Sequence, residues 1–452
     1  MKKTARHIAV DLLSRIESSN AYSNEILDSA IKKNFLSDND QRLLARIFYG
    51  VLENRILIDF HIGNLSKIRI GKLHGKILNS LRIAIYQIIF LDNVPVSAAV
   101  NESVEIANKT NKHSAGFVNG VLRNFVRKYE KGLLPLPGEE NGIRNISVEY
   151  SLPKWLVEEL LKQYDLASVK SMAASNNQVP PLSLRVNTIK TTKNELKQNL
   201  SSIGIETEES IHAVDGLIVK TSKDAGANEN QYFSKGHYYI QDEASMMVSQ
   251  YFSPNSGEVV YDLCAAPGGK TTHIAQIMAQ SGKIRAFDLY SQRIKNIIDN
   301  CNRLGIDIID AESRDSTCTD YKLSESADRV LVDVPCSGIG IFRRKPELKY
   351  RISQNDIDEL IVKQKKLIEN AAVYVRKNGF VVYSTCTVNY NENDKIILDF
   401  LKQNKSFKLV DINECRYPAI FKECLPCIKE AIHTYSHRDG TDGFFICMLQ
   451  KI

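Results

Sequence analysis

Two cysteines in the C-terminal half of the chain have surroundings that suit nucleophilic chemistry. Cys336 lies in the segment Asp-Val-Pro-Cys-Ser-Gly at 333–338, and Cys386 lies in Ser-Thr-Cys-Thr at 384–387. Each segment follows a short apolar run of strand type, so both cysteines are expected in polar loops at strand ends. Backbone dipoles or positive charge in such a loop can stabilise a thiolate, which is the reactive form of cysteine. Cys301, Cys318 and Cys447 are expected instead to act as small hydrophobic residues that pack in the interior.

A loop of small residues precedes these cysteines and has the features of a cofactor site. It reads Cys-Ala-Ala-Pro-Gly-Gly-Lys over 264–270, between a predicted strand and a predicted helix. Glycine lets the backbone approach a ligand closely, and the first N–H groups of a helix attract electron-rich groups. A triphosphate P-loop is excluded because Cys264 stands where its first glycine is required. A dinucleotide fingerprint is excluded because Ala266 and Pro267 replace glycine.

Three aspartates at the ends of successive predicted strands favour a nucleoside cofactor. Asp288 lies 20 residues after Gly268, the usual distance for an acid that bonds ribose hydroxyls. Asp315 follows the next strand and could contact a base, and Asp333 ends the fourth strand at the same edge. A single aspartate is more often a helix cap or a turn former, but three at one edge favour a binding site. A nucleoside without a pyrophosphate fits this pattern, and the cofactor predicted is S-adenosylmethionine.

The region from about residue 236 onward alternates short apolar strands with amphipathic helices, which is typical of a parallel sheet covered on both faces. Strands are predicted at Val259–Leu263, Ile284–Asp288, Ile306–Ile309, Arg329–Val334, Phe380–Ser384 and Phe444–Leu449. Helices are predicted at Thr271–Gln280, Ser291–Leu304, Asp356–Val375 and Glu392–Leu401. Ligands of such sheets bind at the carboxyl ends of the strands, where the loop, the aspartates and the cysteines all fall.

The N-terminal part of the chain has a different pattern. Residues 1–94 contain no proline, and apolar residues recur at helical spacing, so an all-helical structure is expected. Residues 1–135 carry 20 Lys and Arg against 12 Asp and Glu, a net charge of +8, whereas the rest of the chain is at −2. This asymmetry favours a polyanionic partner, most commonly nucleic acid. Arg123, Arg127 and Lys128 could contact phosphates or could simply be solvated.

Composition along the chain predicts its division into domains. Proline, glycine and acidic residues gather between the helical part and the next apolar segment, as in an interdomain linker. The predicted division is a helical domain at 1–135, a linker at 136–153, a small α+β module at 154–235 and an α/β domain at 236–452.

Composition also excludes several classes of protein. Hydrophobic residues make up 43% and charged residues 25% of the chain, which excludes disordered and collagen-like chains. No apolar run approaches the ~18 residues of a membrane span, and charged residues interrupt any signal-peptide core near the start. The nine cysteines, with none before Cys264, do not form a disulfide framework. A cytoplasmic protein is therefore expected.

Together these motifs resemble the family of RNA 5-methylcytosine methyltransferases, in particular its bacterial members that act on 16S ribosomal RNA. Residues 1–135, with Phe-Val-Asn-Gly-Val-Leu-Arg at 117–123, look like an RNA-binding NusB domain. The middle part is similar to the small RNA-contacting module of the family. The catalytic-domain motifs are matched at 264–270, 333–338, 384–387 and 441–445. The resemblance covers nearly the whole chain and implies a Rossmann-like class I methyltransferase domain at 236–452.

The resemblance also implies roles for individual residues. DNA cytosine methyltransferases use the cysteine after proline as nucleophile, whereas the RNA family uses the cysteine after threonine. Cys386 is therefore assigned as the nucleophile that adds to C6 of cytosine, Cys336 acts in product release, and Asp333 orients the base. The implied contacts to S-adenosylmethionine are Cys264, Ala265, Ala266, Pro267, Gly268, Gly269, Lys270, Asp288, Arg293, Asp315 and Asp333.

Two smaller patterns near the cysteines have competing interpretations. Arg343, Arg344 and Lys345 would suit RNA phosphates near the target base, or would form a solvated basic loop. Asn389 and Glu392 have the spacing of a helix N-terminus, so capping is favoured over catalysis.

A zinc site is a weaker hypothesis. Cys424 and Cys427 are followed by His433 and His437, but only five residues separate Cys427 from His433. A zinc finger needs ~12–15 residues there, so no metal is expected.

Other functions compete with the methyltransferase hypothesis. One is a non-catalytic RNA-binding or ribosome assembly protein, which is disfavoured because both cysteines and the glycine loop are present. Others are C5 methylation of another RNA, or methylation of DNA or protein. The expected partner is 16S ribosomal RNA, free or in an early assembly intermediate, and the expected protein is a monomer without membrane contact.

Overall fold

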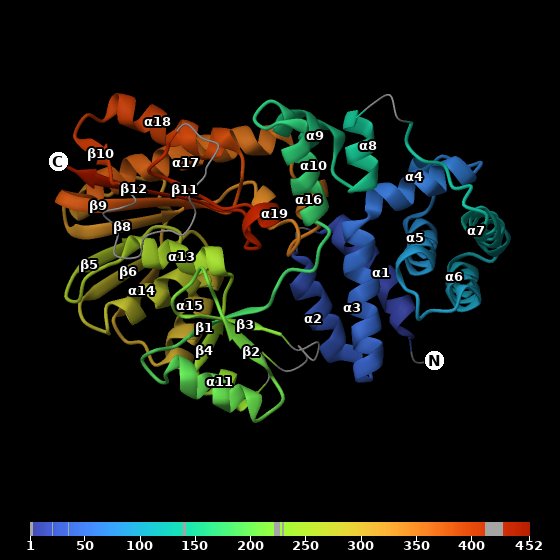
Figure 1. Cartoon of the computed structure of the whole chain (residues 1–452), viewed down its shortest axis with the longest axis horizontal. Helices are drawn as coiled ribbons and strands as arrows, with labels where there is room; N and C mark the ends of the chain where they lie inside the picture. Colours follow the sequence, from blue (N-terminus) through green and yellow to red (C-terminus); the bar gives the residue numbers. More distant parts are fainter. Residues whose placement is uncertain are drawn as a thin grey trace. The chain divides into compact units, whose positions relative to one another are not determined.

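The computed structural model describes residues 3–19, 21–34, 36–138, 142–220, 227, 230–411 and 428–452. The chain divides into two compact units (Figure 1). The first consists of Met1–Val179 with Phe342–Arg351, and the second of Pro180–Ile341 with Ile352–Ile452. Within the described ranges, no helix is both long enough and apolar enough to cross a membrane.

The first unit is helical, as its spacing of apolar residues predicts. Its elements are α1 (Ala5–Ser18), α2 (Ser23–Asn34), α3 (Asp38–Glu53), α4 (Arg55–Leu65), the 3-10 turn η1 (Ile70–Lys72), α5 (Gly75–Phe90), α6 (Val96–Thr110), α7 (Ser114–Glu130), α8 (Gly142–Glu149), α9 (Lys154–Leu161), α10 (Leu166–Ser175) and α16 (Leu348–Arg351). Thr4 and Ser37 begin α1 and α3 by accepting hydrogen bonds from the third amide of each helix. Helix α8 lies within the stretch expected to be a linker.

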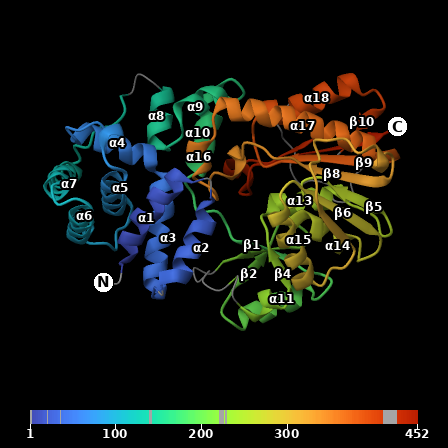
Figure 2. The ribbon, with the colours of Figure 1, turned by 180° about the vertical axis from the view of Figure 1, so that it is seen from behind.

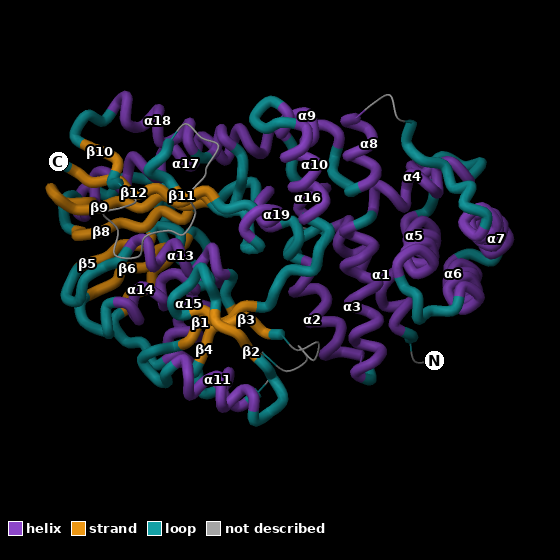
Figure 3. Tube along the Cα trace, in the orientation of Figure 1, coloured by secondary structure: helices purple, strands orange, loops and turns teal. Residues whose placement is uncertain are grey.

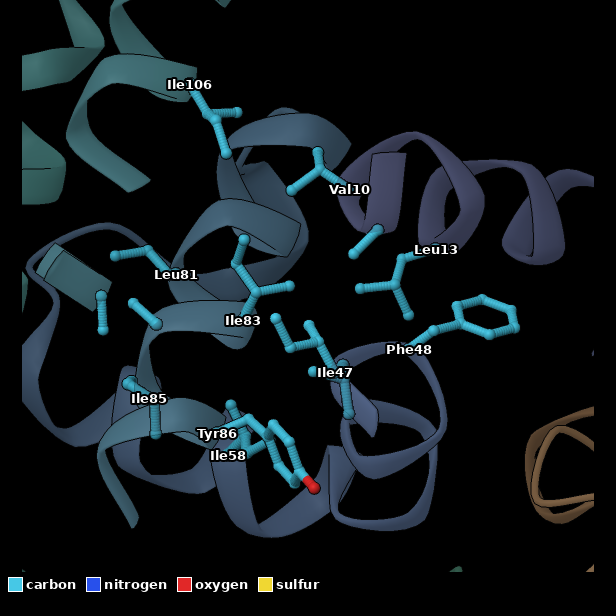
Figure 4. Close-up of a cluster of buried hydrophobic side chains, with 14 of the residues drawn as sticks. Val10, Leu13, Ile47, Phe48, Ile58, Leu81, Ile83, Ile85, Tyr86 and Ile106 are labelled. Atoms are coloured by element: carbon cyan, nitrogen blue, oxygen red, sulfur yellow. The ribbon is translucent and has the colours of Figure 1, made fainter. Parts of the chain in front are cut away.

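Helix α5 forms the centre of the first unit, because its residues are buried from Ile77 to Ile88. Figure 4 shows its Ile83 packed among side chains of neighbouring helices, including Leu13 of α1 and Ile47 of α3. A helix that is buried on all sides is stable only when other elements surround it. This accounts for the many apolar residues of α5, while its buried Arg82 is paired with Glu17 and Asp59.

The segment Phe342–Arg351 belongs to the helical unit although it comes from late in the chain. Arg351 donates hydrogen bonds to the backbone carbonyls of residues 16, 19 and 21 at 3.0, 2.8 and 2.9 Å. Lys345 Nζ lies 4.2 Å from the ring centre of Tyr22, and Arg343 is buried. The basic residues of this segment are therefore not a fully solvated loop.

The second unit begins with an antiparallel sheet of order β2-β3-β1-β4. Its elements are β1 (Ser183–Val186), α11 (Lys193–Ser201), β2 (Thr207–Glu209), β3 (Gly216–Val219), α12 (Gln231–Ser234) and β4 (Tyr238–Ile240). Leu184, Leu196 and Leu217 pack between the sheet and α11. This part has the mixed helix and strand content that the sequence predicts.

A larger sheet of eight strands follows in the same unit (Figure 3). Its strands are β5 (Val259–Asp262), β6 (Lys283–Asp288), β7 (Ile309–Ser313), β8 (Ala327–Asp333), β9 (Val375–Thr385), β10 (Phe407–Leu409), β11 (Ile432–His433) and β12 (Phe445–Lys451). The order is β10-β12-β9-β8-β5-β6-β7, and β11 pairs with β12. The pairs from β9 to β7 are parallel, while β12 runs antiparallel to β9. The strand order reverses between β5 and β8, which is where ligands bind in such sheets.

Helices cover both faces of the large sheet, as Figures 1 and 2 show. One face carries α13 (Glu243–Phe252), α14 (Gly269–Ile277) and α15 (Ser291–Leu304), and the other carries α17 (Gln354–Tyr374) and α18 (Asp394–Gln403). The remaining short elements are η2 (Tyr321–Leu323), η3 (Ile339–Ile341), η4 (Tyr390–Glu392) and α19 (Ser436–Asp439). The sheet covered by helices on both faces, which the sequence predicts from residue 236 onward, is thus present in the structure.

Strand β7 differs from its prediction, and β9 begins at Val375 instead of Phe380. The sequence predicts a strand at Ile306–Ile309, but β7 begins only at Ile309. Gly305 ends α15 in the left-handed conformation, and the amide of Ile306 bonds the carbonyl of Cys301, so this apolar residue closes the helix end. Strand β7 lies at the sheet edge and is half exposed, so it lacks the apolar run of a central strand.

Candidate active site

A cavity of about 250 Å³ lies at the carboxyl ends of the central strands. The loop between β5 and α14 forms one side of it, and Asp333, the last residue of β8, closes another. Its lining residues are Tyr239, Ile240, Gln241, Asp242, Ser245, Asp262, Cys264, Ala265, Ala266, Pro267, Gly269, Lys270 and Asp333. The structure therefore gathers nearly all of the predicted loop around one cavity.

The loop is held tightly against its surroundings. Gly268 has a φ of +100°, and a Cβ there would lie 3.3 Å from Cα of Ile297, so glycine is required both by the backbone and by the close helix. The amide of Gly268 bonds the carbonyl of Ala265 at 2.8 Å. These contacts turn the chain sharply from β5 into α14 and leave the small residues of the loop facing the cavity.

Asp288 and Arg293 brace this loop instead of lining the cavity. Asp288 ends β6 and accepts a hydrogen bond from the amide of Ala266 at 3.2 Å. Arg293 lies 3.3 Å from Asp288 Oδ2 and donates to the carbonyl of Ala266 at 3.1 Å. Asp315 is exposed, and the amide and hydroxyl of Thr317 lower its pKa. The cavity thus contains one of the three predicted strand-end aspartates.

Lys270 and Asp333 form a partly buried ion pair at the cavity edge, with Nζ and Oδ2 2.7 Å apart. Burial opposes the charge of Lys270, but Asp333 and other nearby acidic groups raise its pKa above the ordinary value. Asp262 lies beside this pair, and burial raises its pKa to about 7. The second oxygen of Asp333 accepts from Ser384 Oγ at 2.8 Å, which joins the cavity to the loop that carries Cys386.

The two predicted cysteines lie side by side, with their sulfur atoms 3.1 Å apart. The amide of Cys386 donates to Cys336 Sγ at 3.3 Å. The contact with Cys386 and burial raise the pKa of Cys336 well above that of a free thiol. Deprotonation of Cys336 is therefore disfavoured while Cys386 lies beside it.

Two glycines bring the C-terminal motif against the Cys336 loop. A Cβ on Gly340 would lie 1.9 Å from the carbonyl oxygen of Gly443, so no other residue fits there. The amide of Gly340 bonds the carbonyl of Cys386 at 3.1 Å. The segment 441–445 therefore supports the position of both cysteine loops.

Sequence reasoning missed the wall of the cavity that precedes the large sheet. Tyr239, Gln241, Asp242 and Ser245 come from β4 and the start of α13. Asp242 caps α13 by accepting from the amide of Ala244. The polar residues at the junction of β4 and α13 are a signal for this wall, but they precede the first strand of the parallel sheet.

Arg185 of β1 is a second residue that the sequence did not single out. It is 1% exposed and donates to the backbone carbonyl of Gly269 in the cofactor loop. It also donates to Gln241 Oε1 at 2.6 Å and Thr272 Oγ1 at 2.9 Å. Burial lowers its pKa to about 10, so the guanidinium stays charged at neutral pH. The small sheet thus holds the loop through one side chain.

Arg185→Lys should weaken binding of S-adenosylmethionine about 10-fold, because an ammonium group cannot reproduce the fork of bonds and charged hydrogen bonds contribute ~1.5–3 kcal/mol each. Equilibrium titration of the purified variant measures this. Arg329→Lys is the matched control, since Arg329 is a buried arginine that bonds Glu258 at 2.6 Å. Unchanged cofactor affinity in Arg185→Lys would contradict the assignment.

His273 of α14 should make the second unit sensitive to acid. It is fully buried, and burial lowers its pKa from 6.5 to about 4. Its contribution to stability is present above pH 6.5 and is lost as the pH falls toward 4, because the unfolded state takes up the proton first. The expected loss at pH 4 is about 3 kcal/mol. Urea unfolding of wild type and His273→Gln at pH 7 and pH 4 measures it, and an equal pH dependence in both would refute it.

The residues of the disfavoured zinc pattern are only partly described. Cys424 and Cys427 lie outside the described residues. His433 Nε2 lies 3.0 Å from Asp394 Oδ2 in the interior of the second unit. Among the described residues, no group of three or more His, Cys, Asp or Glu side chains could hold a metal ion.

The sequence is similar over its full length to the probable ribosomal RNA small subunit methyltransferase B of Bacillus subtilis, with 37% identity and 100% of both chains covered. The chain belongs to the 16S rRNA methyltransferase RsmB/F family. The protein of the same name from Synechocystis is 33% identical over 99% of each chain. The resemblance to bacterial RsmB proteins predicted from the motifs is thus confirmed.

Family models agree with the order of parts in this RsmB/F chain. The model described as 16S rRNA methyltransferase RsmB/F matches residues 249–450, the NusB family matches 3–127, and an RsmF/B-like ferredoxin-like domain matches 152–225. Among solved structures, PH0851 covers all of both chains with 28% identity and a TM-score of 0.81. A methyltransferase homolog from Pyrococcus horikoshii covers 69% of this chain and all of its own, with 25% identity and a TM-score of 0.60.

The chain is therefore an S-adenosylmethionine-dependent methyltransferase of small-subunit ribosomal RNA. The cofactor predicted from the strand-end aspartates and the glycine loop is confirmed. The domain bounds and the roles of single residues stay predictions.

Proposed function

We propose that this RsmB/F protein methylates C5 of one cytosine in 16S ribosomal RNA through a covalent adduct with Cys386. The observation that supports this most strongly is the cysteine pair. Two thiols 3.1 Å apart adjoin the partly buried Lys270–Asp333 ion pair at the edge of the cavity. A methyltransferase that used an already nucleophilic oxygen or nitrogen would need neither thiol.

The cavity lining suits a nucleoside attached to an amino acid. Tyr239 and Ala265 supply apolar surface, and Asp262, Asp242 and Lys270 supply charged groups. Such a lining, with a few polar groups in a mostly apolar wall, is typical of small-molecule sites. When bound, S-adenosylmethionine supplies an electrophilic methyl group. The proposed contacts are the loop 264–270 and Asp333, together with Asp288, Arg293 and Asp315.

Cys386 would supply the nucleophile that cytosine needs. C5 of cytosine is a weak nucleophile, and addition of the Cys386 thiolate to C6 makes an enamine that is reactive at C5. Lys270 interacts electrostatically with Cys386, and we propose that this cation favours attack by the sulfur. Asp333 would accept a hydrogen bond from the exocyclic amine or share a proton with N3. The target base must be unpaired or flipped to reach this pair.

The final step breaks the bond between Cys386 and C6. After methyl transfer, a base must take the C5 proton, and the electron pair of that C–H bond then restores the ring double bond as the thiolate leaves. The proposed base is a water that Cys336 positions, or Cys336 itself in its thiolate form.

The helical unit is proposed to bind the RNA. Arg123 and Arg127 are exposed on α7, as a phosphate-contacting face requires. The proposed parts are still 1–135 for RNA binding, 136–153 as a linker, 154–235 for RNA contact and 236–452 for catalysis. A monomeric cytoplasmic enzyme acting on free 16S RNA or an early assembly intermediate remains the prediction.

The test is incubation of the protein with unmodified 16S RNA and methyl-labelled S-adenosylmethionine, followed by nuclease digestion and mass spectrometry of nucleosides. The expected product is 5-methylcytidine at one position. Label on another atom or base would contradict the proposal, and no label at all would favour a non-catalytic RNA-binding protein.

A parallel reaction on intact small subunits should be slower, and equal or faster methylation there would refute free RNA as the substrate.

A further inference from the structure

Glu392 is a fully buried acid that the proposed thiol chemistry does not use. It has 0% exposure at the end of η4. Asn389 does cap η4, as its spacing predicts, by accepting from the amide of Asn391 at 3.2 Å. The Glu392 side chain instead turns toward the Cys336 loop. A buried carboxylate is costly unless donors surround it, so its position calls for an explanation.

The first set of bonds joins Glu392 to the Cys336 loop. Its Oε1 accepts from the amide of Ser337 at 2.8 Å, and its Oε2 accepts from Ser337 Oγ at 2.5 Å. Ser337 directly follows Cys336. Gln364 donates to Glu392 Oε1 at 3.1 Å and to the carbonyl of Pro335 at 3.0 Å. The residues on both sides of Cys336 are therefore fixed through one carboxylate.

The second set of bonds joins the same acid to the Cys386 loop. Ser337 Oγ lies 2.7 Å from Thr387 Oγ1, and Thr387 directly follows Cys386. Asn389 donates to Glu392 Oε2 at 3.0 Å, and Tyr383 OH donates to the Glu392 carbonyl at 2.7 Å. Both loops are thus held against a single side chain within the second unit.

We propose that Glu392 is a positioning residue that sets the spacing of the Cys336 and Cys386 thiols through Ser337 and Thr387. The role as stated rests on the proposed thiol chemistry. A carboxylate suits this place because it offers about four acceptor positions, and four donor groups point at it. Substitution of Glu392 by glutamine keeps the shape of the side chain but replaces one acceptor oxygen with a donor NH2 group. Substitution by alanine removes every hydrogen bond of the carboxylate.

The expected effect is on turnover and not on binding. Glu392→Ala should lower kcat for RNA methylation about 100-fold, the loss that a displacement of ~1 Å in a reacting group can cause. The KM values for RNA and S-adenosylmethionine should change less than about threefold, because no bond of Glu392 reaches the cavity lining. Glu392→Gln should retain part of the activity, since it rescues the shape and some of the bonds.

A second measurement uses the protein alone. Diamide, a diazene oxidant, takes up two hydrogens as two thiols form a disulfide, so its rate with Cys336 and Cys386 reports their spacing. This rate should fall at least ~10-fold in Glu392→Ala, read by peptide mass spectrometry of the cross-link. Thr387→Val keeps the volume of the side chain and removes the hydrogen bond to Ser337, so its cross-linking rate should fall less than that of Glu392→Ala. This variant tests the proposal if Glu392→Ala does not fold.

Glu258→Gln is the matched control. Glu258 is a largely buried acid that pairs with Arg329 at 2.6 Å, next to the amino end of β5. It should lower thermal stability without changing the cross-linking rate. Unchanged kcat and unchanged cross-linking in Glu392→Ala would overturn the role of Glu392. A wild type that cross-links in a Glu392-dependent way but does not methylate RNA would overturn the proposed function and leave the positioning role standing.

Discussion

Cys386→Ala should abolish methylation of 16S RNA and form no adduct with it. The proposed reaction starts with the bond between Cys386 Sγ and C6 of cytosine, and the variant lacks that sulfur, while the neighbouring Cys336, whose sulfur lies 3.1 Å away, has a different proposed role. Removal of a catalytic nucleophile costs roughly 1,000-fold or more. The measurement is initial-rate methylation together with denaturing gels of protein mixed with labelled RNA.

The control for Cys386→Ala is Cys301→Ala, which removes a buried thiol on α15. It should retain most of the methylation activity, and both variants should keep the affinity of the wild type for S-adenosylmethionine. An adduct that persists in Cys386→Ala and disappears in Cys336→Ala would reverse the two roles. In that case the chain would use its Pro-Cys thiol in the manner implied for DNA cytosine methyltransferases.

The positions of the cysteines and of the glycine loop could be predicted because one rule of parallel sheets links them. Residues that end neighbouring strands meet at one edge, so Asp333, Cys386 and the loop after β5 had to come together whatever the packing between helices. The same rule placed Asp288 at the correct strand end. It could not show that Arg293 and Ala266 already occupy its carboxylate, since that depends on side-chain rotamers.

Arg185 and Glu392 could not be predicted because their partners lie far away in the sequence. Arg185 is 84 residues from Gly269, and Glu392 is 55 residues from Ser337. Their local surroundings indicate a strand residue and a helix cap, both ordinary roles. Only the folded chain shows that each buried charge is held by a loop of the active site. Likewise, the edge position of β7 removed the apolar signal that located the central strands.

Cys336→Ala should trap the enzyme on its RNA. In the proposed reaction the methylated intermediate stays bound to Cys386 until the C5 proton is removed, and the described structure places the Cys336 sulfur next to the leaving Cys386 sulfur. Loss of a proton-transferring group lowers rates by about 100-fold or more, while addition and methyl transfer are unaffected. The variant should therefore accumulate a denaturation-resistant protein–RNA complex that carries one transferred methyl group. Gel shift under denaturing conditions with methyl-labelled S-adenosylmethionine measures both features. A Cys336→Ala protein with wild-type turnover and no trapped complex would remove Cys336 from the mechanism, and a trapped complex without label would move its role ahead of methyl transfer.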